Sequence, residues 1–405
     1  MKIGFLYLHA PNESMGSIYR IRNLCLGLAQ LGHKCFIFTP FEYPINWGNS
    51  IKFINILSKT TLQKISPSLY RFLRKILYAP RISLITILNS HFFNFTTNLF
   101  AKNLHKEIEN KKLDLDVLIG ESELAGLILI KLKNGLKFPI ITDFQNFWPE
   151  ELVENGSIRR TSRKYKELLN LVDNVIKKSN LIITPSNLLT IFLIKNFSDK
   201  SNNHKIKTII NGGTPLLEKP LIKKGPPKII NAGMVVSRSN LNFFLDSLPH
   251  VYKEFPDLRV YITRKGERLK SIMKRSKKMN LNINFYWKEN YDDYIKFLSS
   301  CNLGIVTSSY ELTRRLGFVT KIYDYFSVGV PVVGNYIGGW TNIIKQENVG
   351  LLSSGNSMDL AEKIIYLLNN QDLCYKLGMN AINLLKSKYN CKNTARKLVD
   401  VIISL

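Results

Sequence analysis

Apolar and polar positions alternate along the chain in two rhythms, one typical of short buried strands and one typical of helices. In the first half, residues 2–9 and 34–39 are apolar runs, and residues 18–31 between them repeat apolar side chains at helical spacing. The order continues in the second half, where apolar runs and helical stretches again follow one another. The apolar runs lie at 228–232, 259–263, 284–287 and 303–307, and the helical stretches at 241–252 and 292–300. Strands that alternate with helices predict βαβ units and an α/β fold.

A change in composition separates the two halves. Residues 214–228 are rich in Pro, Lys, Gly and Glu and show little periodicity, as expected of a linker. The chain has 405 residues, and single cores stop growing at roughly 250 to 300 residues. We therefore expect an N-terminal domain over 1–214, a linker over 215–228, a C-terminal domain over 229–385 and a final helix over 386–405.

The formal net charge of +27 points to an anionic partner. No acidic residue occurs between Glu42 and Glu107, and basic residues are scattered there among apolar and aromatic ones. This basic, apolar segment over 50–112 favours an anionic membrane surface over nucleic acid, because no zinc-finger, KH or RRM signature is present. The apolar stretch at 82–100 is interrupted by polar residues, so we expect peripheral binding rather than insertion.

The first residues and the cysteines bear on the compartment. Residues 2–8 form a short apolar run that no cleavage site follows, so we expect no secretory signal. The five cysteines include no C-x-x-C pair and have no histidine at ligand spacing, which disfavours structural zinc and a disulfide framework. We expect a cytoplasmic protein that is peripheral at the inner face of the membrane.

The segment 320–334, TKIYDYFSVGVPVVG, is the most informative part of the chain. It predicts a short helix, a glycine stop and a buried strand, with Lys321 and Asp324 on the helix flank opposite the apolar side chains. An ionised Asp324 suits the two hydroxyls of a ribose, and a neighbouring lysine suits a diphosphate. The alternative is that these two residues form an exposed helix ion pair worth about 0.2–0.5 kcal/mol.

This segment resembles the nucleotide-sugar-binding motif of GT-B glycosyltransferases of the retaining family 4 type. Lys321, Tyr325, Gly329 and residues 331–333 match the motif, and Asp324 stands where the family usually has glutamate. The resemblance extends over nearly the whole chain. It implies an α/β fold of two Rossmann-like domains facing across a cleft, with the nucleotide on the second domain, the acceptor on the first, and the last helix packed back towards the first. It implies no metal and no cofactor.

The resemblance also implies which residues bind the donor. Gly16 lies in the loop after the first strand, where backbone N–H groups face a ligand. Two arginines lie in loops that follow strands of the second half, and the glycine pair at 338–339 allows close approach of the backbone. The expected donor-binding residues are Gly16, Arg238, Arg264, Thr320, Lys321, Asp324 and Gly339.

The expected catalytic residues are Asp143, Gln145 and Glu151, which follow a predicted strand at 139–142. Polar residues beyond the carboxyl ends of such strands often bind ligands. Many family members have histidine where this chain has Gln145. Because glutamine cannot exchange a proton near neutral pH, an acid/base role falls to Asp143, Glu150 or Glu151. The alternative is that the two glutamates begin a helix and complement its dipole.

Together these features predict a metal-independent glycosyltransferase that moves a sugar from a nucleotide-sugar donor to a glycan or polyprenyl-linked acceptor with retention of configuration. Two alternatives remain open. One is a catalytically inactive, membrane-associated sugar-nucleotide-binding subunit, since Met15, Gln145, Met234 and Asp324 depart from the usual pattern. The other is a sugar-nucleotide epimerase of the same fold, which the scarcity of histidine disfavours. The sugar, base, linkage and acceptor are not specified by these motifs.

Overall fold

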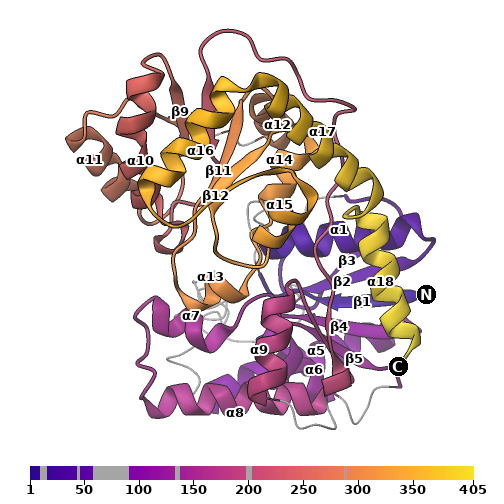
Figure 1. Cartoon of the computed structure of the whole chain (residues 1–405). Helices are drawn as coiled ribbons and strands as arrows, with labels where there is room; N and C mark the ends of the chain where they lie inside the picture. The colour runs from indigo at the N-terminus through magenta and orange to yellow at the C-terminus, as the bar shows by residue number, and fades with distance from the viewer. Residues whose placement is uncertain are drawn as a thin grey trace. The chain divides into compact units, whose positions relative to one another are not determined.

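The structure is a computed structural model, which describes residues 1–9, 16–42, 46–57, 91–132, 137–197, 203–286, 288 and 290–405 (Figure 1). It contains two compact units. The first consists of Met1–Asn211 together with Cys391–Leu405, and the second of Gly212–Asn390. Residues 58–90 of the predicted basic, apolar segment, which include 82–90 of the apolar stretch at 82–100, lie outside the described residues.

The first unit is built on a parallel sheet with the strand order β3-β2-β1-β4-β5-β6-β7. Its strands are β1 (Lys2–Leu6), β2 (Lys34–Thr39), β3 (Ile51–Asn55), β4 (Val117–Glu121), β5 (Ile140–Asp143), β6 (Leu181–Thr184) and β7 (Ile206–Thr208). Its helices are α1 (Gly16–Gln30), α5 (His91–Asn110), α6 (Glu123–Leu132), α7 (Trp148–Glu154), α8 (Arg163–Lys178), α9 (Asn187–Phe197) and α18 (Cys391–Ile403).

The second unit repeats this architecture around a parallel sheet with the order β10-β9-β8-β11-β12-β13. Its strands are β8 (Lys228–Asn231), β9 (Arg259–Thr263), β10 (Ile283–Tyr286), β11 (Leu303–Val306), β12 (Val332–Asn335) and β13 (Gly350–Ser353). Its helices are α10 (Leu241–Glu254), α11 (Leu269–Lys278), α12 (Tyr291–Ser299), α13 (Leu312–Leu316), α14 (Ile322–Ser327), α15 (Thr341–Glu347), α16 (Ser357–Asn369) and α17 (Gln371–Ser387).

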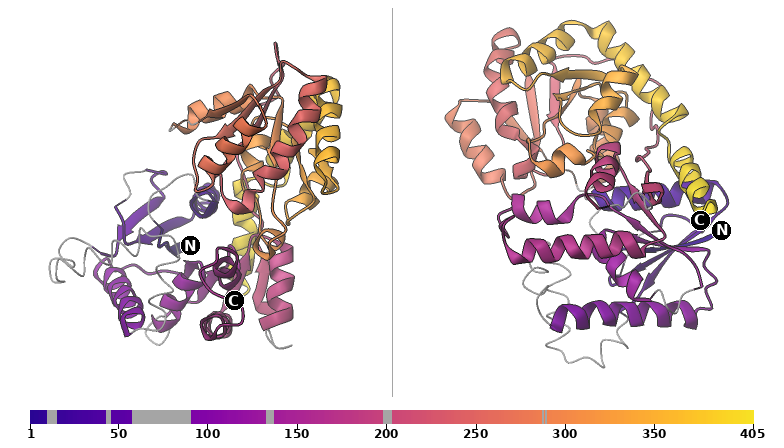
Figure 2. Two further views of the ribbon diagram at one scale, coloured as in Figure 1. Left: turned by 90° about the vertical axis from the view of Figure 1, so that its left-hand side faces the viewer. Right: turned by 60° about the horizontal axis from the view of Figure 1, so that its bottom comes forward.

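The last helix of the chain belongs to the first unit, where it lies beside α1 (Figures 1 and 2). A close approach of the two helices requires Gly27, because a Cβ atom at this position would lie 2.0 Å from the carbonyl oxygen of Cys391. Apolar side chains of α18, among them Leu398 and Ile402, join the core formed by α1 and the sheet. The end of the chain therefore contributes to the core of the first unit.

Two parallel sheets with helices on their faces confirm the predicted α/β class with two Rossmann-like domains. The apolar runs at 34–39 and 259–263 coincide with β2 and β9. Strand β7 ends at Thr208, so Ile209 and Ile210 lie in the segment that follows it.

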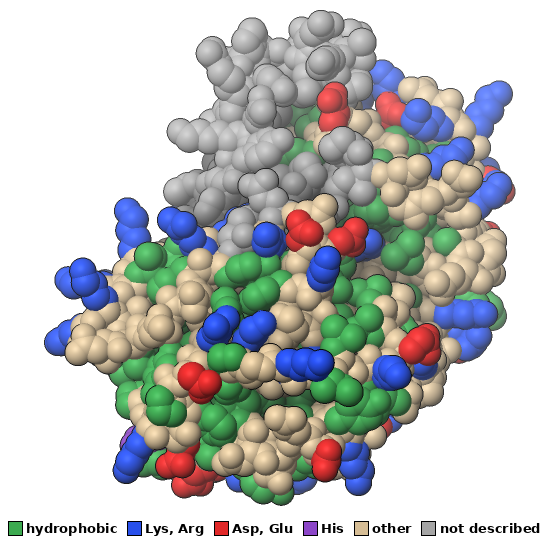
Figure 3. Space-filling model, turned by 90° about the horizontal axis from the view of Figure 1, so that it is seen from above, with side chains coloured by type: hydrophobic (Ala, Val, Ile, Leu, Met, Phe, Trp, Pro, Cys, Tyr) green, Lys and Arg blue, Asp and Glu red, His purple; other side chains and the backbone are tan. Residues whose placement is uncertain are grey.

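In the described part of the chain, no helix is long and apolar enough to cross a membrane. Lysine and arginine side chains are scattered among apolar ones over the face shown in Figure 3 rather than gathered into a single patch.

Candidate functional site

The segment predicted to bind the donor forms a helix, a turn and strand β12, which lies between β11 and β13 in the second sheet. Ile322, Tyr325 and Phe326 of α14 are fully buried, as their helical spacing predicted. Gly329 has a φ of +64°, which favours glycine, and the chain then enters β12. The Tyr325 ring packs against Gly304 of β11, where a Cβ atom would lie 2.5 Å from the ring. Its hydroxyl accepts a hydrogen bond from the Ala232 amide at 3.0 Å.

Lys321, directly before α14, points to the carboxyl end of β8. Its ammonium group donates to the Ala232 carbonyl oxygen at 2.7 Å and to Asn231 Oδ1 at 3.3 Å. Burial lowers the pKa of Lys321 to about 7, and Arg314 acts in the same direction while Asp324 opposes it. An anion brought to this strand end would therefore stabilise the protonated, cationic form of the amino group.

Asp324 lies one helical turn further on and is held by two tyrosines of α12. Tyr291 Oη donates to Oδ1 at 3.1 Å, and Tyr294 Oη donates to Oδ2 at 3.3 Å. Burial, and then the Asp324 charge, raise the pKa of Tyr294 well above its ordinary value, so this hydroxyl stays a donor. Lys321 thus contacts the end of β8, and Asp324 contacts α12. Each side chain has hydrogen-bond partners outside α14.

The loops that carry the two predicted arginines are joined by main-chain hydrogen bonds. The Val235 amide donates to the Lys265 carbonyl at 2.8 Å, and the Arg268 amide donates to the Val235 carbonyl at 3.0 Å. A Cβ atom on Gly266, whose φ is +138°, would lie 2.3 Å from the Val235 carbonyl oxygen. The loop with half-buried Arg238 and the loop with exposed Arg264 are therefore held at the same sheet edge, after β8 and β9.

Gly339 and Thr320 lie near this site, and one main-chain group of each is hydrogen-bonded within the protein. The Gly339 amide donates to the Gly317 carbonyl at 3.1 Å, and the Thr320 carbonyl accepts from the Tyr323 amide at 3.0 Å. The role predicted for Gly339 depended on close approach of its backbone, and in this structure that amide is engaged within the protein.

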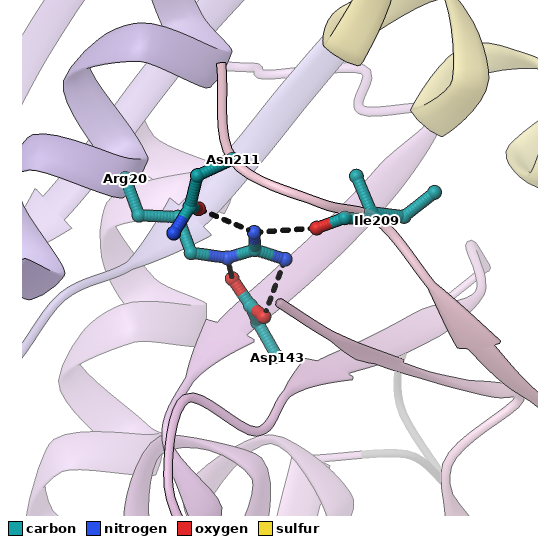
Figure 4. Close-up of polar contacts among 4 residues, drawn as sticks. All are labelled: Arg20, Asp143, Ile209 and Asn211. Carbon is teal, nitrogen blue, oxygen red and sulfur yellow. Dashed lines mark hydrogen bonds and ion pairs between the residues drawn. The ribbon is translucent and has the colours of Figure 1, made fainter. Parts of the chain in front are cut away.

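In the first unit, the predicted catalytic residue Asp143 ends β5 and is paired with Arg20 of α1 (Figure 4). Arg20 Nε and Nη2 donate to the two carboxylate oxygens at 2.6 and 2.9 Å. Arg20 Nη1 donates to the Ile209 carbonyl and to Asn211 Oδ1, both at 2.7 Å. Arg20 is only 1% exposed and Asp143 only 2%. Arg20 therefore connects α1 with β5 and with the segment at Ile209 and Asn211 that follows β7.

The environment of Asp143 combines opposing effects. Burial raises the pKa of its carboxyl above the ordinary value, whereas Arg20 and, to a smaller extent, Gln145 act to lower it. Gln145 lies half-buried two residues further along. Of the three predicted catalytic residues, the structure thus brings Asp143 and Gln145 together.

Glu151 is half-buried in the first turn of α7, together with Glu150. Glu150 is buried and binds Arg160 and Tyr165. Burial acts to raise the pKa of Glu150, but the hydrogen bonds from Arg160 and Tyr165 outweigh it and hold the pKa below its ordinary value. Both glutamates therefore begin a helix, as the alternative interpretation had it, and Glu150 has a structural role there.

Gly16 is the first residue of α1 and is exposed. The rest of the predicted loop, residues 10–15, lies outside the described residues. At the neighbouring strand ends, His9 Nε2 lies 3.3 Å from a carboxylate oxygen of Glu121, which is 1% exposed. Glu121 ends β4, so this pair stands at the same sheet edge as Asp143.

Several of these residues were missed by the sequence analysis. A basic residue on the apolar face of a helix, such as Arg20 between Ile18 and Ile21, was a signal that a buried acidic partner exists. Tyr291 and Tyr294 gave no such signal, since aromatic residues three apart on a helix are typical of a core. Asn231 ends β8, a position that already marked other polar residues.

Comparison with known proteins finds a family match within the second unit. Residues 213–384 match the family described as glycosyl transferases group 1, and this region is named the group 1 domain after that match. An uncharacterised glycosyltransferase of Methanocaldococcus jannaschii is 26% identical over 190 residues. That match covers 46% of this chain and 50% of the relative, so the chain spans about half the length of this relative.

Solved structures resemble the chain over its whole length, the group 1 domain included. Sucrose-phosphate synthase from Thermosynechococcus elongatus superposes with a TM-score of 0.77 at 16% identity, covering 100% of this chain and 98% of the synthase. Anabaena HepE in complex with UDP and glucose gives a TM-score of 0.68 at 13% identity and full coverage of both chains. At these identities the likeness concerns the fold, and it confirms the predicted GT-B fold.

Proposed function

We propose that this protein is a glycosyltransferase that moves a sugar from a nucleotide-sugar donor to a glycan or lipid-linked acceptor with retention of anomeric configuration. The observation that carries the proposal is the placement of Lys321 and Asp324 one turn apart at a strand edge of a group 1 domain. Related folds are known with UDP and with UDP-glucose bound, which supports a nucleotide donor.

In this proposal Asp324 accepts hydrogen bonds from the ribose hydroxyls, and Lys321 faces the diphosphate. Arg238 and Arg264, on the neighbouring loops, add positive charge where the leaving diphosphate becomes more negative. These groups act without a metal ion. Thr320 and Gly339 border the same site, and Gly16 of the first unit stays a proposed donor-binding residue.

The first unit is proposed to bind the acceptor near Asp143, Gln145 and Glu151. In the reaction the bond from the sugar C1 to the diphosphate oxygen breaks, and a bond from C1 to the acceptor oxygen forms. Because Asp143 is paired with Arg20, we assign the acceptor proton to Glu151 or to the departing phosphate oxygen. Asp143 and Gln145 then position the acceptor by hydrogen bonding.

A lipid-linked acceptor would bring the protein to the inner face of a membrane. The net charge of +27 and the basic, apolar composition of residues 50–112 support peripheral attachment to anionic lipid. A nucleic-acid partner has no comparable support in the chain.

The proposal is tested by incubating the full-length protein with a panel of nucleotide sugars and following the released sugar by NMR. We expect slow hydrolysis of one donor, with a first-formed anomer that matches the donor. Asp324→Asn should slow it about tenfold or more, since a hydrogen bond to a charged group is worth about 1.5–3 kcal/mol. Asp372→Asn, at an exposed position of α17, should leave the rate unchanged.

Two other outcomes would contradict this assignment. Nucleotide binding without turnover of any donor would identify the alternative, an inactive sugar-nucleotide-binding subunit. Release of a sugar epimerised at another carbon would identify an epimerase of the same fold, and release of the opposite anomer would exclude retention.

A further inference from the structure

A second basic site lies in the first unit, at the amino ends of β1, β2 and β3. A cavity of about 270 Å³ opens there, lined by four lysines and by Asn49 and Ser50. The lysines are Lys2, Lys34, Lys52 and Lys112. Asp143, proposed to act in transfer, lies at the carboxyl end of β5 in the same parallel sheet, so this cavity lies at the opposite edge of that sheet.

Strand register places three of the lysines on one face of the sheet. Lys2 of β1 is aligned with Lys34 of β2, and Phe36, two residues after Lys34, is aligned with Lys52 of β3. Residues two apart on a strand, and residues aligned across parallel strands, point to the same face. Lys2 and Lys34 are thus direct neighbours about 4.8 Å apart along the hydrogen-bonding direction. Like charges in this arrangement destabilise a sheet unless an anion compensates them.

The fourth lysine is brought to the cavity at the end of α5 in an unfavourable backbone conformation. Lys112 has a φ of +46°, a value that glycine adopts most readily. The turn is closed by hydrogen bonds from the Lys112 amide to the Glu109 carbonyl at 2.9 Å and from the Leu113 amide to the Ile108 carbonyl at 3.0 Å. Glycine is the usual residue at this helix end, so the lysine is present despite a local cost.

Acidic groups near the cavity do not balance these charges. Asp114 lies 3.9 Å from Lys2 Nζ, but its side chain is 97% exposed. Asp116 accepts a hydrogen bond at 2.6 Å from the main-chain amide of Lys2, so Asp114 is the acidic residue that pairs with the Lys2 ammonium group. The residues that line the cavity therefore include four lysines, Ser50 and Asn49 beside the less polar Cys35, Phe36 and Leu113, and the two nearby carboxylates do not offset the four positive charges.

We infer that this cavity is a binding site for a phosphate-bearing anion, separate from the donor site on the group 1 domain. Clustered ammonium groups with a hydroxyl and an amide suit the several oxygens of a phosphate or diphosphate. Two kinds of ligand carry such a phosphate group: a free phosphorylated metabolite and a phospholipid head group. The inference does not depend on the proposed transfer reaction.

The test measures pyrophosphate binding to the full-length protein by isothermal titration calorimetry. Lys34→Gln/Lys52→Gln should weaken the binding about tenfold or more, since each charge-assisted contact is worth about 1.5–3 kcal/mol. Lys112→Gly should also weaken it, and because glycine favours the left-handed turn this variant should unfold at the same or higher denaturant concentration than the native protein. Lys166→Gln/Lys195→Gln, which removes the same charge from exposed positions of α8 and α9, should bind pyrophosphate as the native protein does.

The source of the ligand is decided by co-sedimentation of the same variants with phosphatidylglycerol vesicles. A loss of vesicle binding in the cavity variants but not in the Lys166→Gln/Lys195→Gln control assigns the site to a lipid head group. A loss of pyrophosphate binding with unchanged vesicle binding assigns it to a free phosphorylated ligand. If the cavity variants match the control in both measurements, the site is excluded, whatever nucleotide the group 1 domain binds.

Discussion

Lys321 shows how one side chain links the fold to the proposed chemistry. Its ammonium group is held by the Ala232 carbonyl and by Asn231, which keep it at the end of β8. Burial lowers its pKa to about 7, so part of the population is neutral at physiological pH. An incoming diphosphate favours the protonated form and must therefore raise this pKa.

Donor binding should consequently be linked to proton uptake. Between about pH 7 and the higher pKa of the complex, binding takes up a proton, and affinity falls as pH rises through this window. Titration with a nucleotide sugar at pH 8 in two buffers of different ionisation enthalpy measures the uptake. Lys321→Arg keeps its charge throughout this range, so this variant should take up none. Absence of proton uptake by the native protein would show that Lys321 does not face the diphosphate.

At the same scale, Asp143 and Arg20 show the limit of sequence reasoning. The position of Asp143 after a strand was predictable from the apolar run before it, and its candidate role followed from that position. Its bidentate partner, Arg20, is more than a hundred positions away in α1. Arg20 also donates hydrogen bonds to Ile209 and Asn211. Local patterns do not report which distant groups meet, so the pairing was visible only in the structure.

At the scale of elements, the strands and helices of the group 1 domain were largely predictable. The start of α10 and the bounds of β9 were predictable from the spacing of their apolar residues. The end of α14 was predictable from Gly329, which adopts the positive φ that favours glycine. The hydrogen bonds from Tyr291 and Tyr294 to Asp324 were not predictable, because they depend on how α12 packs beside α14. Such packing is decided by side chains from several strands at once.

The packing of α14 on β11 leads to a prediction about Gly304. Gly304→Ala would bring a Cβ atom to 2.5 Å from the Tyr325 ring, and such overpacking costs about 1–3 kcal/mol. The displaced ring would also weaken the hydrogen bond from the Ala232 amide, beside the carbonyl that holds Lys321. We expect a lower midpoint in urea unfolding together with weaker nucleotide binding. An unchanged midpoint would show that α14 packs on this strand less closely than described.

For the molecule as a whole, the two parallel sheets, the group 1 domain and the net charge of +27 are all consistent with the proposed glycosyltransferase. The fold class was predictable because alternating apolar runs and helical stretches admit few architectures. The ligands were less accessible to sequence analysis, since the same fold serves many substrates and the site residues determine which one binds. Lys321 and Asp324 are the residues on which the proposed nucleotide-binding site depends.

The most direct test is a thermal-shift measurement with a panel of nucleoside diphosphates and nucleotide sugars on the native protein, Asp324→Ala and the control Asp372→Ala. Binding to the folded state stabilises it by about 2.7 kcal/mol at a hundredfold excess over Kd. We expect a selective shift in the native protein and in Asp372→Ala that is lost in Asp324→Ala. No shift with any nucleotide, or equal shifts in all three proteins, would contradict this expectation.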